Sequence, residues 1–402
     1  MKRLVPLLLD WFSANARDLP WRRTRDPYSI WVSEIMLQQT QVKTVIPYWK
    51  RWMRELPTIE AVAKAHSEKI HKLWEGLGYY TRARNLQKAA QQIVEKHDAR
   101  SETCRRQGNE SQTENKLETP HVVSCKFPRN FDDVLALPGI GRYTAGAICS
   151  IAFNQPTAIL DGNVIRVLAR VFGIGKNPRE RKTNAQLWRL AEELVIHAAS
   201  SPFICRRRRK GSHSISLSSQ RLLTSSPTCS HLNQSLMELG ALICTPRHPK
   251  CPVCPVKKLC VAFRENRVED LPNLGKREAA TARRFVAFVI ERNGRFLVRQ
   301  RPAGVVNAHL WEFPNVEIPS GKFNPKFTAK NILGAGCLGI KPFCTVKHSI
   351  TRYRITLEAF IARLNDSAAK TDGFWKTPAQ LQQLAFSAAH KTVLNKLTAA
   401  PK

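Results

Sequence analysis

The sequence contains no long apolar run and few acidic residues. No segment reaches the roughly twenty consecutive apolar residues that a bilayer-spanning helix needs, which excludes a helical membrane protein. The N-terminal stretch is too short, and becomes acidic too soon at Asp10, to be a secretory signal peptide. We therefore expect a soluble, cytoplasmic protein.

Acidic residues are outnumbered by basic ones, 31 against 64, which gives a formal net charge of +33. A charge of this size favours a polyanionic partner, because self-repulsion would otherwise strain the folded state. Nucleic acid is the leading candidate. An anionic membrane surface is the alternative, but the chain shows neither a lipidation motif nor a basic amphipathic helix.

Most of the chain has the apolar period of helices, with residues recurring at three- and four-residue spacing. The pattern is clearest from Trp31 to Ile46, where Glu34 lies on a face made mainly of Leu and Gln side chains. The period is lost in 98–126 and 200–230, which predicts two disordered insertions.

The last third of the chain changes to the pattern of strands. The apolar run 285–290 is followed by a turn at 292–294 and a second strand at 295–299. The predicted organisation is a helical domain at 1–273, a linker at 274–283 and an α+β domain at 284–402.

The sequence contains 11 cysteines, and without a secretion signal these are expected to be thiols or metal ligands. Four of them form the pattern C-x6-C-x2-C-x5-C, whose thiolates can converge on one metal centre. A zinc site is the alternative, because the inner C-x2-C spacing also suits zinc. The four cysteines are Cys244, Cys251, Cys254 and Cys260.

The segment 137–146, LPGIGRYTAG, predicts a tight glycine turn that leads into a helix. Gly139 and Gly141 would let the backbone approach a DNA phosphate, and the helix start would offer free N–H groups to it. Ordinary helix packing is the alternative explanation for such a turn.

Two isolated carboxylates could carry out chemistry. Asp161 lies in the apolar segment 159–164, where capping of the next helix is the simpler explanation. Together with Glu34, however, it could break a glycosidic bond. That reaction needs one acid that donates a proton and one ionised group that faces the developing positive charge.

Several segments together resemble a bacterial adenine DNA glycosylase of the MutY family. They are WVSEIMLQQTQV at 31–42, GLGYY at 76–80, the glycine turn, LDGNV at 160–164 and the four-cysteine loop. The resemblance covers nearly the whole chain except the two insertions. It implies a mostly α fold, namely a two-lobed helix-hairpin-helix glycosylase domain with a [4Fe-4S] loop at 244–260, followed by a smaller α+β Nudix-like domain.

The resemblance also implies roles for individual residues. Glu34 would protonate the flipped adenine and Asp161 would stabilise the oxocarbenium-like sugar, with Tyr143 and Asn163 supporting them. The residues implied around the adenine are Trp21, Arg22 and Gln234. Those implied to wedge into the duplex are Gln39, Leu77 and Tyr79.

Position 143 separates two types of enzyme within the superfamily. Endonuclease III-like enzymes have a lysine here, whose amine forms the Schiff base that leads to strand cleavage. This chain has Tyr143, so base removal without an efficient lyase step is expected. A bifunctional pyrimidine glycosylase and a catalytically inert DNA-binding protein are the alternatives.

The C-terminal domain resembles a Nudix fold with LWEFP at 310–314. Between Pro314 and Glu358 the only acid is Glu317, so the glutamates that bind metal in Nudix hydrolases are missing. We therefore expect the domain to recognise DNA rather than to act as a Nudix hydrolase. In the MutY family a Phe-Ser-His loop recognises 8-oxoguanine. The matching stretch looks like Ile350-Thr351-Arg352, which keeps the hydroxyl at Thr351.

The resemblance therefore implies a partner. It is double-stranded DNA containing A·8-oxoguanine or A·G mispairs, bound by a nucleoid-associated monomer.

Overall fold

The computed structural model describes most of the chain. It covers residues 2–107, 127–200, 228–275, 278–319, 321, 323–333, 337–350, 352–364 and 372–399. The chain divides into two compact units, of which the first comprises Met1–Ala63 and Lys88–Lys276 and the second comprises Lys64–Gln87 and Arg277–Lys402. No helix within the described ranges is long and apolar enough to cross a membrane.

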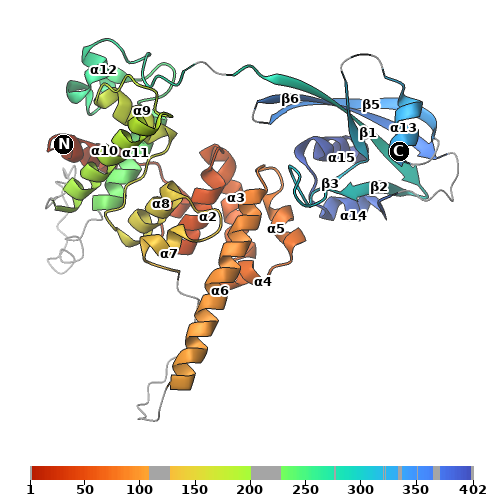
Figure 1. Cartoon of the computed structure of the whole chain (residues 1–402), viewed down its shortest axis with the longest axis horizontal. Helices are drawn as coiled ribbons and strands as arrows, with labels where there is room; N and C mark the ends of the chain where they lie inside the picture. The colour runs from red at the N-terminus through yellow and green to blue at the C-terminus, as the bar shows by residue number, and fades with distance from the viewer. Residues whose placement is uncertain are drawn as a thin grey trace, which may run out of the picture. The chain divides into compact units, whose positions relative to one another are not determined.

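The first unit is helical, as predicted (Figure 1). Its main apolar core lies between the N-terminal helix and four helices from the second half of the unit. The helices of this unit are α1 (Leu4–Asn15), α2 (Pro27–Leu37), α3 (Val42–Glu55), α4 (Ile59–Lys64), α6 (Thr81–Gln107) from Lys88 onward, α7 (Phe131–Leu135), α8 (Arg142–Phe153), α9 (Gly162–Val171), α10 (Arg181–Ser200), α11 (Thr228–Leu242) and α12 (Val261–Arg264), with short 3-10 turns η1 (Pro20–Arg22), η3 (Cys251–Val253) and η4 (Lys257–Leu259).

The single helix predicted from Trp31 to Ile46 is in fact two helices. α2 ends at Leu37 and α3 begins at Val42, and Gln39 between them has a left-handed φ of 55°. Since a left-handed residue interrupts the α-helical hydrogen bonding, the Gln-rich face predicted for one helix does not exist beyond Leu37. The amide side chains of this connection are instead available to line a cavity.

The predicted disorder of the insertions is wrong at the start of the first one. Helix α6 (Thr81–Gln107) runs into the segment 98–126 as far as Gln107. The loss of apolar period led to that prediction, but the backbone stays helical as far as Gln107. In the second insertion, Ser200 ends α10 and residues 228–230 begin α11. The rest of both insertions, 108–126 and 201–227, lies outside the described residues.

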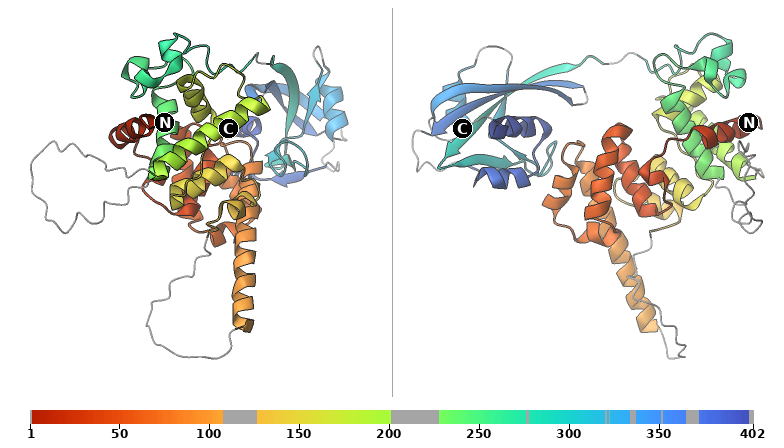
Figure 2. Two further views of the ribbon diagram at one scale, coloured as in Figure 1. Left: turned by 60° about the vertical axis from the view of Figure 1, so that its left-hand side comes forward. Right: turned by 180° about the vertical axis from the view of Figure 1, so that it is seen from behind.

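The second unit is built around a mixed sheet with the strand order β3-β2-β1-β6-β5 (Figures 1 and 2). β1 and β6 are parallel, the other pairs are antiparallel, and β4 and β7 pair with β1 and β2 respectively. The strands are β1 (Thr281–Arg292), β2 (Arg295–Gln300), β3 (Trp311–Glu312), β4 (Asn315–Ile318), β5 (Cys337–Ile350), β6 (Tyr353–Leu364) and β7 (Phe374–Lys376).

Helices cover both faces of this sheet. Val286 and Phe288 of β1 pack with α13 (Pro325–Leu333), whereas Ala287 and Val289 pack with α14 (Pro378–Gln383) and α15 (Ala388–Ala399). Because side chains of a strand alternate between faces, burial on both sides explains the continuous apolar run at 285–290. β1 begins at Thr281, inside the predicted linker.

The second unit also includes a segment that the sequence assigns to the helical domain. Residues Lys64–Gln87, which contain α5 (Ser67–Trp74) and the first turns of α6, group with the C-terminal sheet and its helices. Hydrophobic periodicity identifies a helix but not the domain against which it packs, so the sequence pattern could not place this segment.

Candidate active site

A cavity of about 510 Å³ opens in the helical unit. Its volume lies within the range typical of ligand pockets. The lining brings together eight residues to which the family resemblance assigns roles, although they are spread over more than 200 positions of the sequence. These residues are Trp21, Arg22, Glu34, Gln39, Tyr143, Asp161, Asn163 and Gln234.

Glu34 lies near the end of α2 and is only 5% exposed. The Tyr143 hydroxyl, from α8, donates a hydrogen bond to Glu34 Oε2 at 2.9 Å. Burial raises the pKa of Glu34 from 4.5 to about 7, which the hydrogen bond from Tyr143 opposes and the negative charge of Asp161 reinforces. A carboxyl group with this pKa is protonated in much of the population at neutral pH, so it can act as a general acid.

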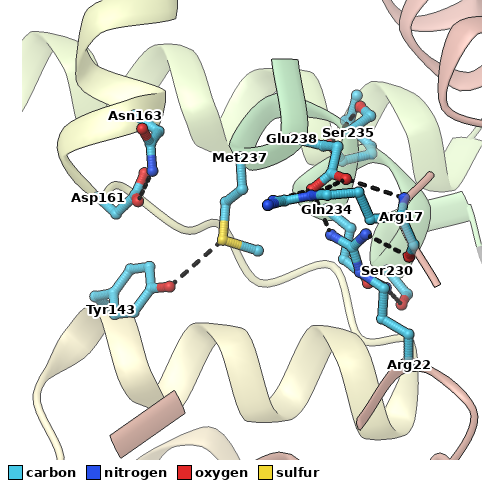
Figure 3. Close-up of polar contacts among 11 residues, drawn as sticks. Arg17, Arg22, Tyr143, Asp161, Asn163, Ser230, Gln234, Ser235, Met237 and Glu238 are labelled. Carbon is cyan, nitrogen blue, oxygen red and sulfur yellow. Dashed lines mark hydrogen bonds and ion pairs between the residues drawn. The ribbon is translucent and has the colours of Figure 1, made fainter. Parts of the chain in front are cut away.

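Asp161 has a more polar environment than Glu34. It is the N-cap of α9, where it accepts a hydrogen bond from the Val164 N–H at 2.7 Å. It also accepts one from Asn163 Nδ2 at 2.9 Å (Figure 3). Burial raises its pKa, but these hydrogen bonds and the charge of Arg166 oppose the rise. The capping explanation is thus correct, and the same carboxylate also lines the cavity.

A buried ion-pair cluster forms another part of the cavity wall. Glu238 of α11, whose side chain is 1% exposed, accepts hydrogen bonds from Arg17 Nε at 2.7 Å and from Arg22 Nη2 at 2.9 Å (Figure 3). Burial alone would raise the pKa of Glu238, but the two guanidinium groups outweigh it and lower the pKa to about 2. Glu238 is therefore ionised and holds both arginines in place.

The sequence reasoning missed Arg17, Met237 and Glu238 as site residues. Arg17 and Glu238 are 221 positions apart, so no local pattern pairs them. A weak signal for Glu238 was available, because an acid in the otherwise apolar segment 236–243 should have a buried partner. Met237 places its Sδ 3.4 Å from the Tyr143 hydroxyl. In Figure 3 it lies between Asp161 and Glu238.

The amide of Gln234 and the indole of Trp21, both predicted around the adenine, also line the cavity. Gln234 is 8% exposed and donates to the Ser230 hydroxyl at 3.0 Å. Trp21, in η1, is buried and meets Trp49 edge to face. The cavity wall thus combines apolar side chains with polar groups that could orient a small ligand.

The glycine turn has the predicted local form. Gly139 adopts a φ of 77°, which favours glycine, and Gly141 is the N-cap of α8. A Cβ atom added at Gly141 would meet nothing within 4 Å, so the approach to the start of α8 is open. This geometry suits the proposed backbone contact with a phosphate.

The remaining predicted contact residues belong to the second unit. Leu77 is 6% exposed, and Tyr79, with a left-handed φ of 47°, is 42% exposed. Arg352 is exposed and donates to Glu278 at 3.3 Å. Thr351 lies outside the described residues.

The four loop cysteines line one small cavity of about 20 Å³ beside α9 and α11. All four are free thiols, and the other lining residues contribute no carboxylate or imidazole. Within the described part of the chain, no three His, Cys, Asp or Glu side chains are already arranged as a metal site. The convergence of four thiols on one cavity nevertheless fits a thiolate-bound metal centre.

Arg166 connects the cysteine loop to the capping network of Asp161. Its Nε donates to the Cys244 carbonyl at 2.7 Å, and its Nη2 donates to Asn163 Oδ1 at 2.7 Å. Helices α9 and α11 are in close contact here. A Cβ atom added at Gly240 would lie only 2.6 Å from Asn163 Cβ, so the contact requires glycine at this position. Arg166 therefore links the loop to the amide side chain that donates to Asp161.

Comparison with known proteins identifies two families along the chain. Residues 32–193 match the HhH-GPD superfamily of base excision DNA repair proteins, and residues 285–396 match the NUDIX domain.

The chain is also similar to adenine DNA glycosylases of mammals. It is 35% identical to that of Rattus norvegicus, with 79% of this chain aligned to 61% of the rat protein. Identity is 31% to that of Mus musculus and 32% to that of Homo sapiens, with 96% of this chain aligned to 76% and 72% of those proteins. The chain thus spans less than two thirds of the rat relative's length. The similarity to these relatives and the order of the two domains show that the chain belongs to the adenine DNA glycosylase family.

Proposed function

We propose that the chain is a monofunctional glycosylase that hydrolyses the N-glycosidic bond of adenine mispaired with 8-oxoguanine or guanine. The observation that carries this proposal is the pair of carboxylates in one cavity, Glu34 with a pKa of about 7 and Asp161 in a hydrogen-bonded setting. Two acids whose environments differ in this way supply one proton donor and one anion.

The reaction begins when adenine is flipped out of the duplex, because the glycosidic bond is inaccessible inside the base stack. Glu34 donates its proton to a ring nitrogen of the base, and the bond from the sugar carbon breaks with its electron pair leaving on adenine. Asp161 faces the positive charge that develops on the sugar. Water then adds to that carbon and loses a proton, for which the Glu34 carboxylate is the acceptor.

The two carboxylates are held by side chains already in place. Tyr143 donates to Glu34, and Asn163 donates to Asp161. Tyr143 carries no amine that could attack the sugar carbon, so the chain lacks the lysine of the lyase mechanism at this position.

The C-terminal unit is proposed to read the lesion opposite adenine. In the described residues Glu317 is engaged with Arg283, and Glu358 with Arg284, so neither is a free metal ligand. The segment 350–352 connects β5 and β6, and Arg352 at its end is exposed. We propose that this connection contacts 8-oxoguanine.

Excision assays on defined duplexes test the proposed activity. We expect single-turnover release of adenine opposite 8-oxoguanine, slower release opposite guanine, and strand breakage only after alkali. An oxidised pyrimidine should remain in place. Release of the pyrimidine with strand cleavage would establish the endonuclease III type of activity instead, and absence of any release despite DNA binding would establish an inert binding protein.

We propose that Cys244, Cys251, Cys254 and Cys260 hold a [4Fe-4S] cluster, because their four free thiols line one cavity. When bound, the cluster supplies a structural anchor for a loop that carries three lysines and one arginine.

Metal analysis is expected to find iron and sulfide in a brown purified protein. Cys251→Ser should lower solubility and DNA binding together, because the loop folds around its metal. Cys344→Ser, which alters a half-buried thiol on β5, is the matched control and should retain the colour. Zinc in place of iron would contradict the cluster assignment.

A further inference from the structure

The turn 76–80, between α5 and α6, is held by side-chain hydrogen bonds to its backbone. Gly76, Gly78 and Tyr79 all have left-handed φ values, of 106°, 70° and 47°. The Gly78 carbonyl accepts hydrogen bonds from Trp74 Nε1 at 3.0 Å and from Arg82 Nη2 at 3.1 Å. These hydrogen bonds hold the backbone next to Tyr79, whose side chain is 42% exposed.

The residue just before this turn, Glu75, binds the C-terminal end of the same unit. Its Oε1 accepts a hydrogen bond from the backbone N–H of Phe386 at 2.9 Å. Its Oε2 lies 2.8 Å from Lys72 Nζ and 3.5 Å from Lys391 Nζ of α15. The Glu75 side chain is only 12% exposed, so these charge-assisted contacts are largely shielded from water.

Other contacts join the same two segments. Lys72 Nζ also donates to the Leu384 carbonyl at 3.0 Å, and the Tyr80 hydroxyl donates to the Phe386 carbonyl at 3.5 Å. Arg84 donates to the Ala308 carbonyl at 3.0 Å, and the rings of His71 and His309 are stacked. Glu75 is distinctive among them because it alone joins a backbone donor and two cations.

Phe386 belongs to the core of the Nudix-like sheet. It is fully buried, and its neighbour Ala385 accepts a hydrogen bond from the Trp311 N–H of β3 at 2.9 Å. The ring of Phe386 also contacts that of Phe313, at 5.7 Å between centroids. A contact to Phe386 is therefore a contact to the sheet itself.

We propose that Glu75 is a positioning residue that fixes the turn 76–80 to the Nudix-like sheet. The exposed Tyr79 and the β5–β6 connection then approach the DNA as parts of one body. This inference rests on the proposed function, because it assigns the coupling to discrimination of 8-oxoguanine from guanine opposite adenine. Loss of Glu75 should lower that preference rather than the chemistry, because Glu34 and Asp161 lie in the other unit.

The test compares Glu75→Gln and Glu75→Ala with the wild-type chain, using single-turnover excision and binding on A·8-oxoguanine and A·G duplexes. Glu75→Ala should lower the preference for 8-oxoguanine by about tenfold, the effect of losing a charge-assisted hydrogen bond. Glu75→Gln keeps an acceptor for the Phe386 N–H but loses the charge, so its preference should be intermediate. Lys391→Met should resemble Glu75→Gln.

Matched controls are Glu68→Gln, on an exposed position of α5, and Lys396→Met, on an exposed position of α15. Both should keep the wild-type preference. Hydrogen exchange at the Phe386 amide gives a readout that does not depend on catalysis, and it should be faster in Glu75→Ala.

The outcomes separate the two proposals. If the wild-type chain excises no adenine while exchange at Phe386 responds to Glu75→Ala, the proposed function fails but the contact stands. If the wild-type chain prefers 8-oxoguanine and Glu75→Ala leaves the preference unchanged, or lowers excision from both duplexes equally, the positioning role is overturned.

Discussion

Glu34→Gln is expected to bind the mismatch with near wild-type affinity and to excise adenine at least about a hundredfold more slowly, the usual cost of losing a general acid. Glutamine keeps the size of the side chain and an oxygen that can accept the 2.9 Å hydrogen bond from Tyr143. It has no proton acidic enough to transfer to the departing base. Single-turnover rates measured beside dissociation constants separate the two effects.

The pH dependence of the wild-type rate follows from the same residue. Because the pKa of Glu34 is about 7, excision should fall by about tenfold per pH unit above that value as the acid loses its proton. The Glu34→Gln rate should lack this decline.

Stability should change over the same pH range. The folded pKa of about 7 lies above the ordinary value of 4.5, so the stabilisation linked to protonation is complete below pH 4.5 and is lost as the pH rises through 7. Glu34→Gln should consequently gain stability relative to wild type between these values.

Glu193→Gln, on an exposed position of α10, is the matched control for Glu34→Gln and should keep the wild-type rate and pH profile. A Glu34→Gln enzyme with a near wild-type excision rate would falsify the assignment of Glu34 as the acid.

Individual residues that line the cavity were easier to find from the sequence than the contacts that hold them together. Glu34 and Asp161 were recognisable because each is an acid in an otherwise apolar or amide-rich segment. Asp161 also had a local signature, since an N-cap depends only on the next three residues. Both predictions needed no knowledge of long-range packing.

Long-range pairings could not be read in this way. The ion pairs of Glu238 with Arg17 and Arg22 span more than 200 positions, and the contact of Glu75 with Phe386 spans 311. Nothing in the sequence around Glu75 distinguishes it from an ordinary exposed helix residue. The break between α2 and α3 was missed for a different reason, because a left-handed Gln39 has no sequence signal comparable to glycine.

Asp161→Asn is expected to abolish most excision by a route that differs from loss of the acid. The developing positive charge on the sugar would face a neutral amide, and losing one preorganised electrostatic contact costs about 10²–10³-fold in rate. Asparagine is as good an N-cap as aspartate, so α9 should keep its start at the Val164 N–H. The fold should therefore survive the substitution, which a change to alanine would not guarantee.

Asp26→Asn provides the matched control for Asp161→Asn, because Asp26 caps α2 through the Tyr28 and Ser29 N–H groups but does not line the cavity. It should excise adenine at the wild-type rate. The decisive measurements are single-turnover excision and thermal unfolding for both variants. If Asp161→Asn lost activity only in proportion to a loss of folded protein, Asp161 would be a helix cap alone. If the variant folded fully but excised adenine at least about a hundredfold more slowly, the charge of Asp161 would take part in the reaction. Asp26→Asn makes this conclusion possible, because it removes a capping charge of the same kind without that effect.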